Sequence, residues 1–350
     1  MQKREHYGFT IVELLVVIVV VGILAAITIV SYTGINQRAV AASLQSDLGN
    51  SQKQIKLFQV VNSAYPSTIN CSQPDSSTNK CLRYSGGNSY NYKTSLTNLN
   101  IFCLEAINSA NNKTYSVNQD GQLLNSPCPV LDINASSPFS YSGTGTTWRD
   151  MSGNDNNGTL LNGITYSNSG GGSMSFDGLD DYVQIADSAS LRTGSVTVSV
   201  WYYIRDNPDC DANNNWRSLI RTSSATSGSW IGFDIVLEED RRIAWDTGTG
   251  TSDRWWPSGS VLPMNTWSNL TVVYDSTGSK QYYLEGVLMS SKSVPAVPIS
   301  PDTGGIFLSE AAASACPNGN GDFPGLIKSV RIYGQALSAD QIKAVYNATK

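Results

Sequence analysis

Residues 7–32, YGFTIVELLVVIVVVGILAAITIVSY, are the feature that most constrains what this chain can fold into. Between positions 14 and 30 the residues are aliphatic except for one Gly and one Thr. A run of this length is about what a helix needs to cross a bilayer. Glu13 lies at the N-terminal end of the run, with no basic partner inside it. Because an unpaired charge in hydrocarbon costs several kcal/mol, the fold must supply a partner for Glu13.

Two simple interpretations of this segment leave something unexplained. A secretory signal peptide has an apolar core of about 7–15 residues followed by a cleavage site. The run is longer than that, and its helical pattern continues well past the LAA sequence that could serve as such a site. A plain membrane anchor accounts for the length but leaves Glu13 without a role.

The sequence GFTIVELLVVIVVVGILAAI resembles the N-terminal signature of type IV pilins and the pseudopilins of secretion systems. This resemblance implies that a prepilin peptidase cuts between Gly8 and Phe9, and that the new amine of Phe9 is methylated. It also implies that Glu13 neutralises the N-terminal amine of a neighbouring subunit when the helices pack into a filament. The precursor would then be a single-pass membrane protein with the basic leader, residues 1–8, in the cytoplasm. After assembly it would lie on a pilus or at the cell surface.

We expect the helix to continue as a stem over residues 9–62, with the transmembrane part at about 9–32. Apolar residues recur at helical spacing beyond the run and predict one face packed on a globular head. These residues are Val40, Leu44, Leu48, Ile55 and Phe58. The head is predicted over residues 63–130 as a small antiparallel sheet, including a hairpin in KTYSVNQDGQLL with Asp120-Gly121 in its turn.

The six cysteines divide four and two between the halves of the chain, which favours disulfides and an oxidising compartment. Close spacing favours the pairs Cys71 with Cys81 and Cys103 with Cys128, although four cysteines allow three connectivities. Cys210 and Cys316 lie in polar loops, either as a bridge or as two free thiols.

A domain boundary is expected near residues 131–145, which we predict to be a linker. Residues 1–130 carry a net charge of +3 and the remainder −8, and all eight tryptophans lie beyond this boundary. About nine strand candidates separated by turns then predict an all-β sandwich or jelly roll. The candidates are SMSFDG, YVQIA, SVTVSVWYYIR, SWIGFDIVL, RRIAWD, TWSNLTVVYD, QYYLEGVLM, GGIFLS and GLIKSVRIYG. A short helix capped by Ser338 closes the chain. The predicted fold class is thus a long helix with a disulfide-stapled α+β head, followed by an all-β domain.

Residues 146–350 resemble the laminin G-like, concanavalin A-type jelly roll through motifs such as WRDMSGNDNNGTL, MSFDGLDDYVQI and FPGLIKSVRIYGQALSADQI. In some members of that superfamily, Asp and Asn of the opening motif bind Ca²⁺. This resemblance implies Asp150, Asn154 and Asn157 as calcium ligands, which suits their hard oxygen atoms. The same residues in a Gly-rich loop also serve as turn formers that bond their own backbone.

For ligand contact the sequence offers DRWWPSG, in which Trp255 and Trp256 follow Arg254. Aromatic faces beside a cation suit stacking on a sugar or a protein hot spot. The alternative is that one Trp packs in the core while the other covers the sheet.

Catalysis is not expected. The only histidine, His6, lies in the predicted leader, which leaves a mature chain without the commonest general base. Jelly-roll glycoside hydrolases of the laminarinase type carry Glu-x-Asp-x-x-Glu, whereas EEDRRI at 238–243 ends in Ile and reads as a hairpin turn.

The low charge content, 15%, and net charge of −5 give no basic surface for nucleic acid. We therefore expect a minor or tip pilin-like subunit that displays a laminin G-like domain to a glycan or protein ligand. Its partners would be other pilin subunits, the prepilin peptidase and the membrane. Alternatives are a pseudopilin whose added domain binds exported substrate, and a carbohydrate-active enzyme of jelly-roll fold.

Overall fold

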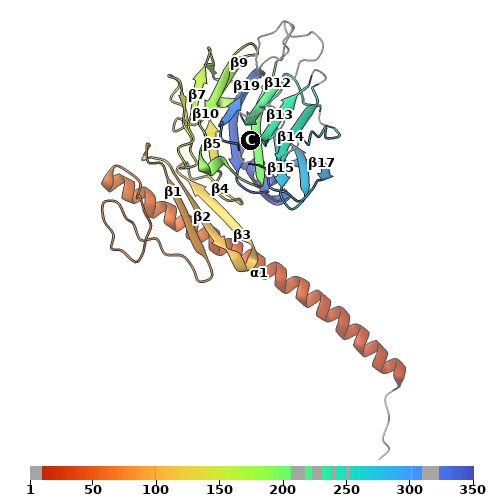
Figure 1. The fold of residues 1–350 in the computed structure, drawn as a ribbon. Coiled ribbons are helices and arrows are strands. Elements are labelled where there is room, and N and C mark those ends of the chain that lie inside the picture. The colour runs from red at the N-terminus through yellow and green to blue at the C-terminus, as the bar shows by residue number, and fades with distance from the viewer. Residues whose placement is uncertain are drawn as a thin grey trace, which may run out of the picture.

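A computed structural model of the chain describes residues 10–98, 100–205, 217–222, 231–238, 241–249, 253–259, 261–300, 302–309 and 323–350. One helix, α1 (Ile11–Asn62), extends away from a globular part that contains two β structures (Figure 1). It is the one helix of the described residues that is long and apolar enough to cross a membrane. The large aliphatic side chains described between Ile11 and Ile29 are 48–83% exposed, with Ile11 at 83% and Leu24 at 59%. The predicted long stem helix is thus confirmed over the described residues, while its transmembrane part stays a prediction.

The second half of α1 forms the core of the head. Leu44, Leu48 and Ile55 are fully buried, and they pack with the strands of a small antiparallel sheet. This sheet has the order β1 (Ser89–Thr94), β2 (Phe102–Asn108), β3 (Lys113–Asn118) and β4 (Leu123–Leu124), with the short 3-10 helix η1 (Ser109–Asn111) after β2. The predicted apolar stripe and the β3–β4 hairpin are therefore confirmed. Figure 1 shows the sheet lying along the upper part of the stem.

Two disulfides staple the head as predicted. Cys71 bonds to Cys81, and Cys103 on β2 bonds to Cys128. Cys210 and Cys316 lie outside the described residues, so their pairing stays a prediction.

The rest of the chain is a sandwich of two antiparallel sheets around one core. The first sheet has the order β14 (Ile243–Thr249), β13 (Ile231–Leu237), β12 (Arg217–Thr222), β18 (Ile306–Leu308), β10 (Tyr182–Ile185), β7 (Gly158–Leu161) and β6 (Thr147–Trp148). The second has the order β17 (Val287–Ser293), β16 (Ser279–Leu284), β15 (Ser268–Asp275), β11 (Val196–Ile204), β19 (Pro324–Tyr333), β9 (Ser173–Asp177) and β8 (Thr165–Ser167), and β5 (Leu131–Asn134) also pairs with β19. Two short 3-10 helices lie between strands: η2 (Ser169–Gly171) joins β8 to β9, and η3 (Ala189–Leu191) lies between β10 and β11.

The closing helix α2 (Ala339–Thr349) begins at Ser338, whose side chain accepts a hydrogen bond from the backbone of Gln341. Ile342 and Val345 of α2 pack on the outer face of the second sheet. The prediction of a Ser338-capped helix is confirmed.

Two sequence predictions are corrected by the sheets. The predicted linker 131–145 is wrong at its start, because Leu131–Asn134 is strand β5 and pairs with residues 329–332 of β19. Strand β9 pairs with residues 324–327 of β19. The two strands β5 and β9 therefore lie end to end along the same edge of β19. QYYLEGVLM is two strands rather than one, since Glu285 and Gly286 have φ angles of +52° and +71° and form the tight turn between β16 and β17.

Candidate functional site

The N-terminus of the stem is organised by Thr10 and Glu13. Thr10 caps α1, and the backbone N–H of Glu13 donates to its hydroxyl oxygen at 3.2 Å. The Glu13 carboxylate in turn accepts hydrogen bonds from the backbone N–H and the hydroxyl of Thr10, at 2.9 and 2.7 Å. This reciprocal arrangement places a negative charge where the helix dipole favours one. Gly8 and Phe9 lie outside the described residues, so cleavage between them stays a prediction.

The loop that contains Arg254, Trp255 and Trp256 closes the edge of the sandwich beside β14. The backbones of Trp255 and Trp245 exchange two hydrogen bonds, at 2.9 and 3.0 Å, and the Trp255 side chain packs against the sandwich core. Trp256 is 46% exposed, and the Arg254 guanidinium lies 6.0 Å from the centre of its ring. The structure therefore divides the predicted pair into a partly buried Trp255 packed against the core and an exposed Trp256, and ligand contact by this pair stays a prediction.

Charged side chains hold this loop in place. Arg254 donates to the buried carboxylate of Asp246 at 2.7 Å, and the Trp256 ring N–H donates to Glu238 at 2.6 Å. Lys280 is fully buried, and its ammonium group donates to the backbone carbonyl of Asp253 and lies 3.2 Å from the Asp253 carboxylate. Burial lowers the pKa of Lys280 to about 8. The exposed ring of Trp256 is thus presented on a well-anchored loop.

EEDRRI lies between β13 and β14, and among its described residues the backbone N–H of Glu238 donates to the carbonyl of Arg242 at 2.8 Å. Leu237 is the last residue of β13 and Ile243 the first of β14. Glu238 lies 3.6 Å from the Arg242 guanidinium in addition to its contact with Trp256. Glu239 and Asp240 lie outside the described residues.

The side chains of the opening motif, which were predicted to bind calcium, make contacts within their own loop. Asp150 is 1% exposed, and its two carboxylate oxygens accept four hydrogen bonds, from the backbones of Asp132, Ser152 and Asn156 and from the Ser152 hydroxyl. Burial raises the pKa of Asp150 to about 6 even against these four bonds. The Asn157 side-chain oxygen accepts from the backbone of Asp150, whereas the Asn154 amide donates to the carbonyl of Val130. This bonding fits a loop-forming role better than a shared set of metal ligands, and calcium here stays a prediction.

The same loop carries a residue that the sequence analysis did not select. Asp155 points away from the sandwich and accepts hydrogen bonds from Ser95, Leu96 and Thr97, all on the head. The bond from the Leu96 backbone is 2.9 Å and that from the Thr97 hydroxyl 2.7 Å. Beside it Gly153 has φ +84°, and a Cβ atom there would lie 3.0 Å from the backbone of Lys93. This loop therefore clamps the sandwich to the head.

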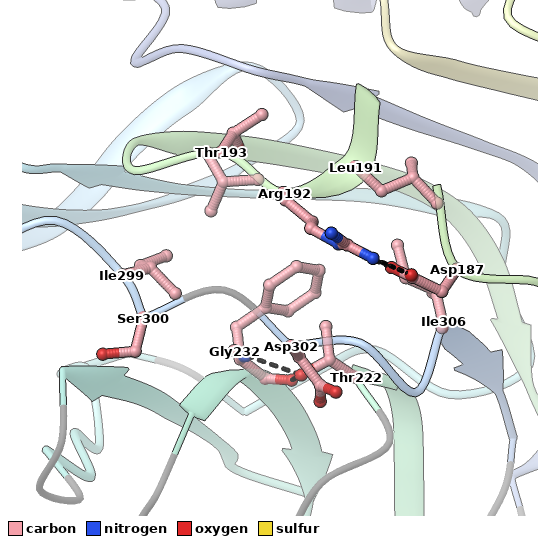
Figure 2. Close-up of a pocket in the computed structure, with 13 residues that line it drawn as sticks. Asp187, Leu191, Arg192, Thr193, Thr222, Gly232, Ile299, Ser300, Asp302 and Ile306 are labelled. Atoms are coloured by element: carbon pink, nitrogen blue, oxygen red, sulfur yellow. Dashed lines mark hydrogen bonds and ion pairs between the residues drawn. The ribbon is translucent and has the colours of Figure 1, made fainter. Parts of the chain in front are cut away.

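A small cavity lies at the end of the first sheet, where Arg192 pairs with Asp187 (Figure 2). Its volume is about 20 Å³, and Thr222, Ser300 and Asp302 are among the residues that line it. That volume is close to the space of one water molecule. The cavity is too small for a sugar ring.

Two parts of the chain match models of known protein families. Residues 3–29 match the family model described as the prokaryotic N-terminal methylation motif, and residues 176–343 match the concanavalin A-like lectin/glucanases superfamily. The type II secretion system core protein G of Aeromonas hydrophila is 35% identical over 68 residues, which are 19% of this chain and 48% of that protein. The same protein of Pseudomonas aeruginosa is 34% identical over 68 residues, with the same coverage. The chain thus spans about half the length of these curated relatives.

Solved structures resemble the chain at low sequence identity. The binding domain of botulinum neurotoxin serotype G has a TM-score of 0.47 and 15% identity over 62% of this chain and 50% of that one. Domain 4 of AbnA, an extracellular arabinanase from Geobacillus stearothermophilus, has a TM-score of 0.46 and 16% identity over 63% of this chain and 98% of that one. From the family matches and the fold, the chain joins a prokaryotic N-terminal methylation motif of the pilin and pseudopilin type to a concanavalin A-like jelly-roll domain.

Proposed function

We propose that the chain is a minor or tip subunit of a pilin-like fibre and displays its jelly roll as an extracellular recognition module. The observation that carries this proposal is the division of α1 into two halves. The first half exposes a continuous aliphatic surface, while Leu44, Leu48 and Ile55 of the second half are buried in the head. The large aliphatic side chains described between Ile11 and Ile29 are 48–83% exposed in the single chain, which suits first a membrane and then the helices of other subunits.

The attached sandwich favours a minor or tip position. It is clamped to the head through Asp155, and a second contact joins the Gln122 amide of the head to the backbone of Ala348 in α2. A bulky domain held in this way would obstruct dense packing of identical subunits. A position at or near the end of a fibre avoids that conflict.

A second candidate function is a pseudopilin of a secretion machine, in which the sandwich binds exported substrate. The names of the matched relatives favour it, since they are core proteins of type II secretion systems. Both functions require processing by a prepilin peptidase and assembly through Glu13. They differ in whether the assembled fibre reaches the cell surface.

Recognition, rather than catalysis, is the proposed role of the sandwich. Its best-presented contact group is Trp256 with the adjacent Arg254, and an aromatic face beside a cation suits a sugar or a protein surface. Of the acids in EEDRRI the structure describes Glu238, whose carboxylate accepts a hydrogen bond from Trp256 and pairs with Arg242.

The assembly proposal can be tested by shearing filaments from cells that express the full chain. Immunoblots of the sheared and membrane fractions would compare the wild type with Glu13→Gln and with Asp340→Asn, which removes an exposed carboxylate of α2. We expect the wild type and Asp340→Asn in the sheared fraction, and Glu13→Gln retained in the membrane. Recovery of Glu13→Gln at the wild-type level would contradict the proposal. Loss of protein export on deleting the gene, with no chain on sheared filaments, would favour the second candidate.

Ligand recognition can be tested with a glycan array probed by the full chain in detergent. Trp256→Ala should lose the glycans that the wild type binds. Phe139→Ala, which removes another exposed aromatic ring of the sandwich, should retain them. Identical binding by both variants would exclude the Trp256 surface as the contact.

A further inference from the structure

Three aspartates converge where the chain passes from one sheet of the sandwich to the other. Asp177 ends β9 in the second sheet, and Asp180 and Asp181 directly precede β10 in the first. One carboxylate oxygen from each residue lies within 4.8 Å of the other two. Asp177 and Asp180 are exposed, whereas Asp181 is 3% exposed.

The buried Asp181 carboxylate is only half satisfied. Its Oδ2 accepts a hydrogen bond from the backbone N–H of Asp177 at 2.9 Å. Its Oδ1 is buried and has no hydrogen-bond partner among the residues that the structure describes. None of the ion pairs found in that part of the chain involves any of the three aspartates. A buried acceptor without a donor is unfavourable, and two neighbouring negative charges add to the cost.

The ligand atoms and their spacing suit a hard divalent cation. Three oxygens that lie within 4.8 Å of one another share a point at most about 2.8 Å from each, near the Ca–O distance of about 2.3–2.6 Å. Carboxylate oxygens are the ligands that calcium prefers, while zinc sites in proteins usually include nitrogen or sulfur. Magnesium needs distances of about 2.0–2.1 Å in a strict octahedron.

A second connection between the two sheets lies beside the aspartates. Residues 162–164 connect β7 of the first sheet to β8 of the second, and the Asn162 amide donates to the backbone carbonyl of Asp180 at 2.8 Å. A Cβ atom on Gly163 would lie 3.3 Å from the unpartnered Oδ1 of Asp181. An ion at this position would therefore stabilise both connections at once.

We propose that Asp177, Asp180 and Asp181 bind a divalent cation of the size of calcium, which fixes the two crossings between the sheets. This site is separate from the opening motif, whose Asp150 oxygens already accept four hydrogen bonds.

The test uses the full chain in detergent after treatment with EDTA. Calcium chloride alone is titrated by calorimetry, and thermal unfolding is followed with and without it. Asp181→Asn keeps an oxygen for the Asp177 N–H and replaces the other oxygen by an amide that can donate to the two remaining carboxylates. Asp187→Asn, beyond the other end of β10, serves as the control.

We expect calcium to raise the unfolding temperature of the wild type and of Asp187→Asn. In Asp181→Asn the affinity should fall by about tenfold or more, and the calcium-free protein should be at least as stable as the wild type. The proposal would be overturned by a wild type that shows neither heat nor a thermal shift, or by Asp181→Asn binding calcium as the wild type does. A calcium-free Asp181→Asn less stable than the wild type would assign Asp181 a purely structural role. Loss of binding in Asn154→Ala, with binding kept in Asp181→Asn, would place the ion in the opening motif.

Discussion

At the scale of single residues, the pair of Asp132 and Arg331 joins β5 to β19. The Arg331 Nε atom donates to Asp132 Oδ1 at 2.9 Å, and both side chains are 5% exposed. Arg331 also donates to the side chain of Gln122 in the head at 3.0 Å. Removing one partner of a buried pair leaves an uncompensated charge in a medium that solvates it poorly.

We therefore predict that Asp132→Ala lowers the free energy of unfolding by about 3–5 kcal/mol. Urea denaturation of the full chain in detergent would measure it. Asp75→Ala provides the comparison, because it breaks the much more exposed pair of Asp75 with Lys80 and should change stability less. Equal effects of the two substitutions would show that burial does not set the cost.

The buried lysine was accessible to sequence reasoning but was not selected. In SKQYYL, alternation along a strand places Lys280 on the same face as Tyr282, which is fully buried. A lysine at an inward position needs a buried acceptor. Its partner Asp253 is 27 residues earlier in the chain, and the sequence does not reveal that pairing.

At the scale of elements, periodic segments were predicted well and short ones poorly. The stem stripe and the alternating valines of β11 follow clear periods, so the burial of these apolar residues could be anticipated, whereas the burial of Thr197 and Ser199 between the valines could not. Strands β5, β6 and β8 have two to four residues and carry no readable period. They exist because a longer strand offers its edge to them, which is a tertiary effect.

Strand β5 should decide where a stable sandwich begins. We predict that a fragment of residues 129–350 unfolds cooperatively, whereas one of residues 140–350 is much less stable. The shorter fragment loses Leu131 and Ile133, both fully buried, and leaves Arg331 without Asp132. Circular dichroism melts of the two fragments would compare them. Matching melts would mean that β5 is dispensable.

At the scale of the whole molecule, the sequence predicted two parts but not how they are joined. Asp155 lies about sixty residues from its hydrogen-bond donors at positions 95–97, and no sequence pattern links the two segments. The GNDNNG motif suggested ligands because its residue types suit calcium. The surroundings instead assign Asp150 to the loop itself and Asp155 to the contact between the parts.

The clamp makes the coupling between head and sandwich depend on pH. Burial raises the pKa of Asp155, but hydrogen bonds from Ser95, Thr97 and Leu96 outweigh it and hold the pKa below its ordinary value. A carboxylate with a lowered pKa stabilises the folded state above the ordinary Asp range, near pH 3.9. That contribution is lost as the pH falls through the lowered pKa.

We predict that Asp155→Ala weakens the clamp by about 1–2 kcal/mol at pH 7, the low end for a charged acceptor because the site is partly exposed. Scanning calorimetry of the full chain in detergent should show the head and sandwich unfolding at more widely separated temperatures than in the wild type. The difference between the two proteins should shrink as the pH falls from about 4, where the released carboxylate begins to be protonated, and should vanish below the lowered pKa of the clamped Asp155. Asp275→Ala, which removes an acceptor for the nearby Thr277 backbone and lies away from residues 95–97 in the chain, should leave the separation unchanged. If Asp155→Ala unfolds like the wild type from pH 3 to pH 7, other contacts hold the two parts together.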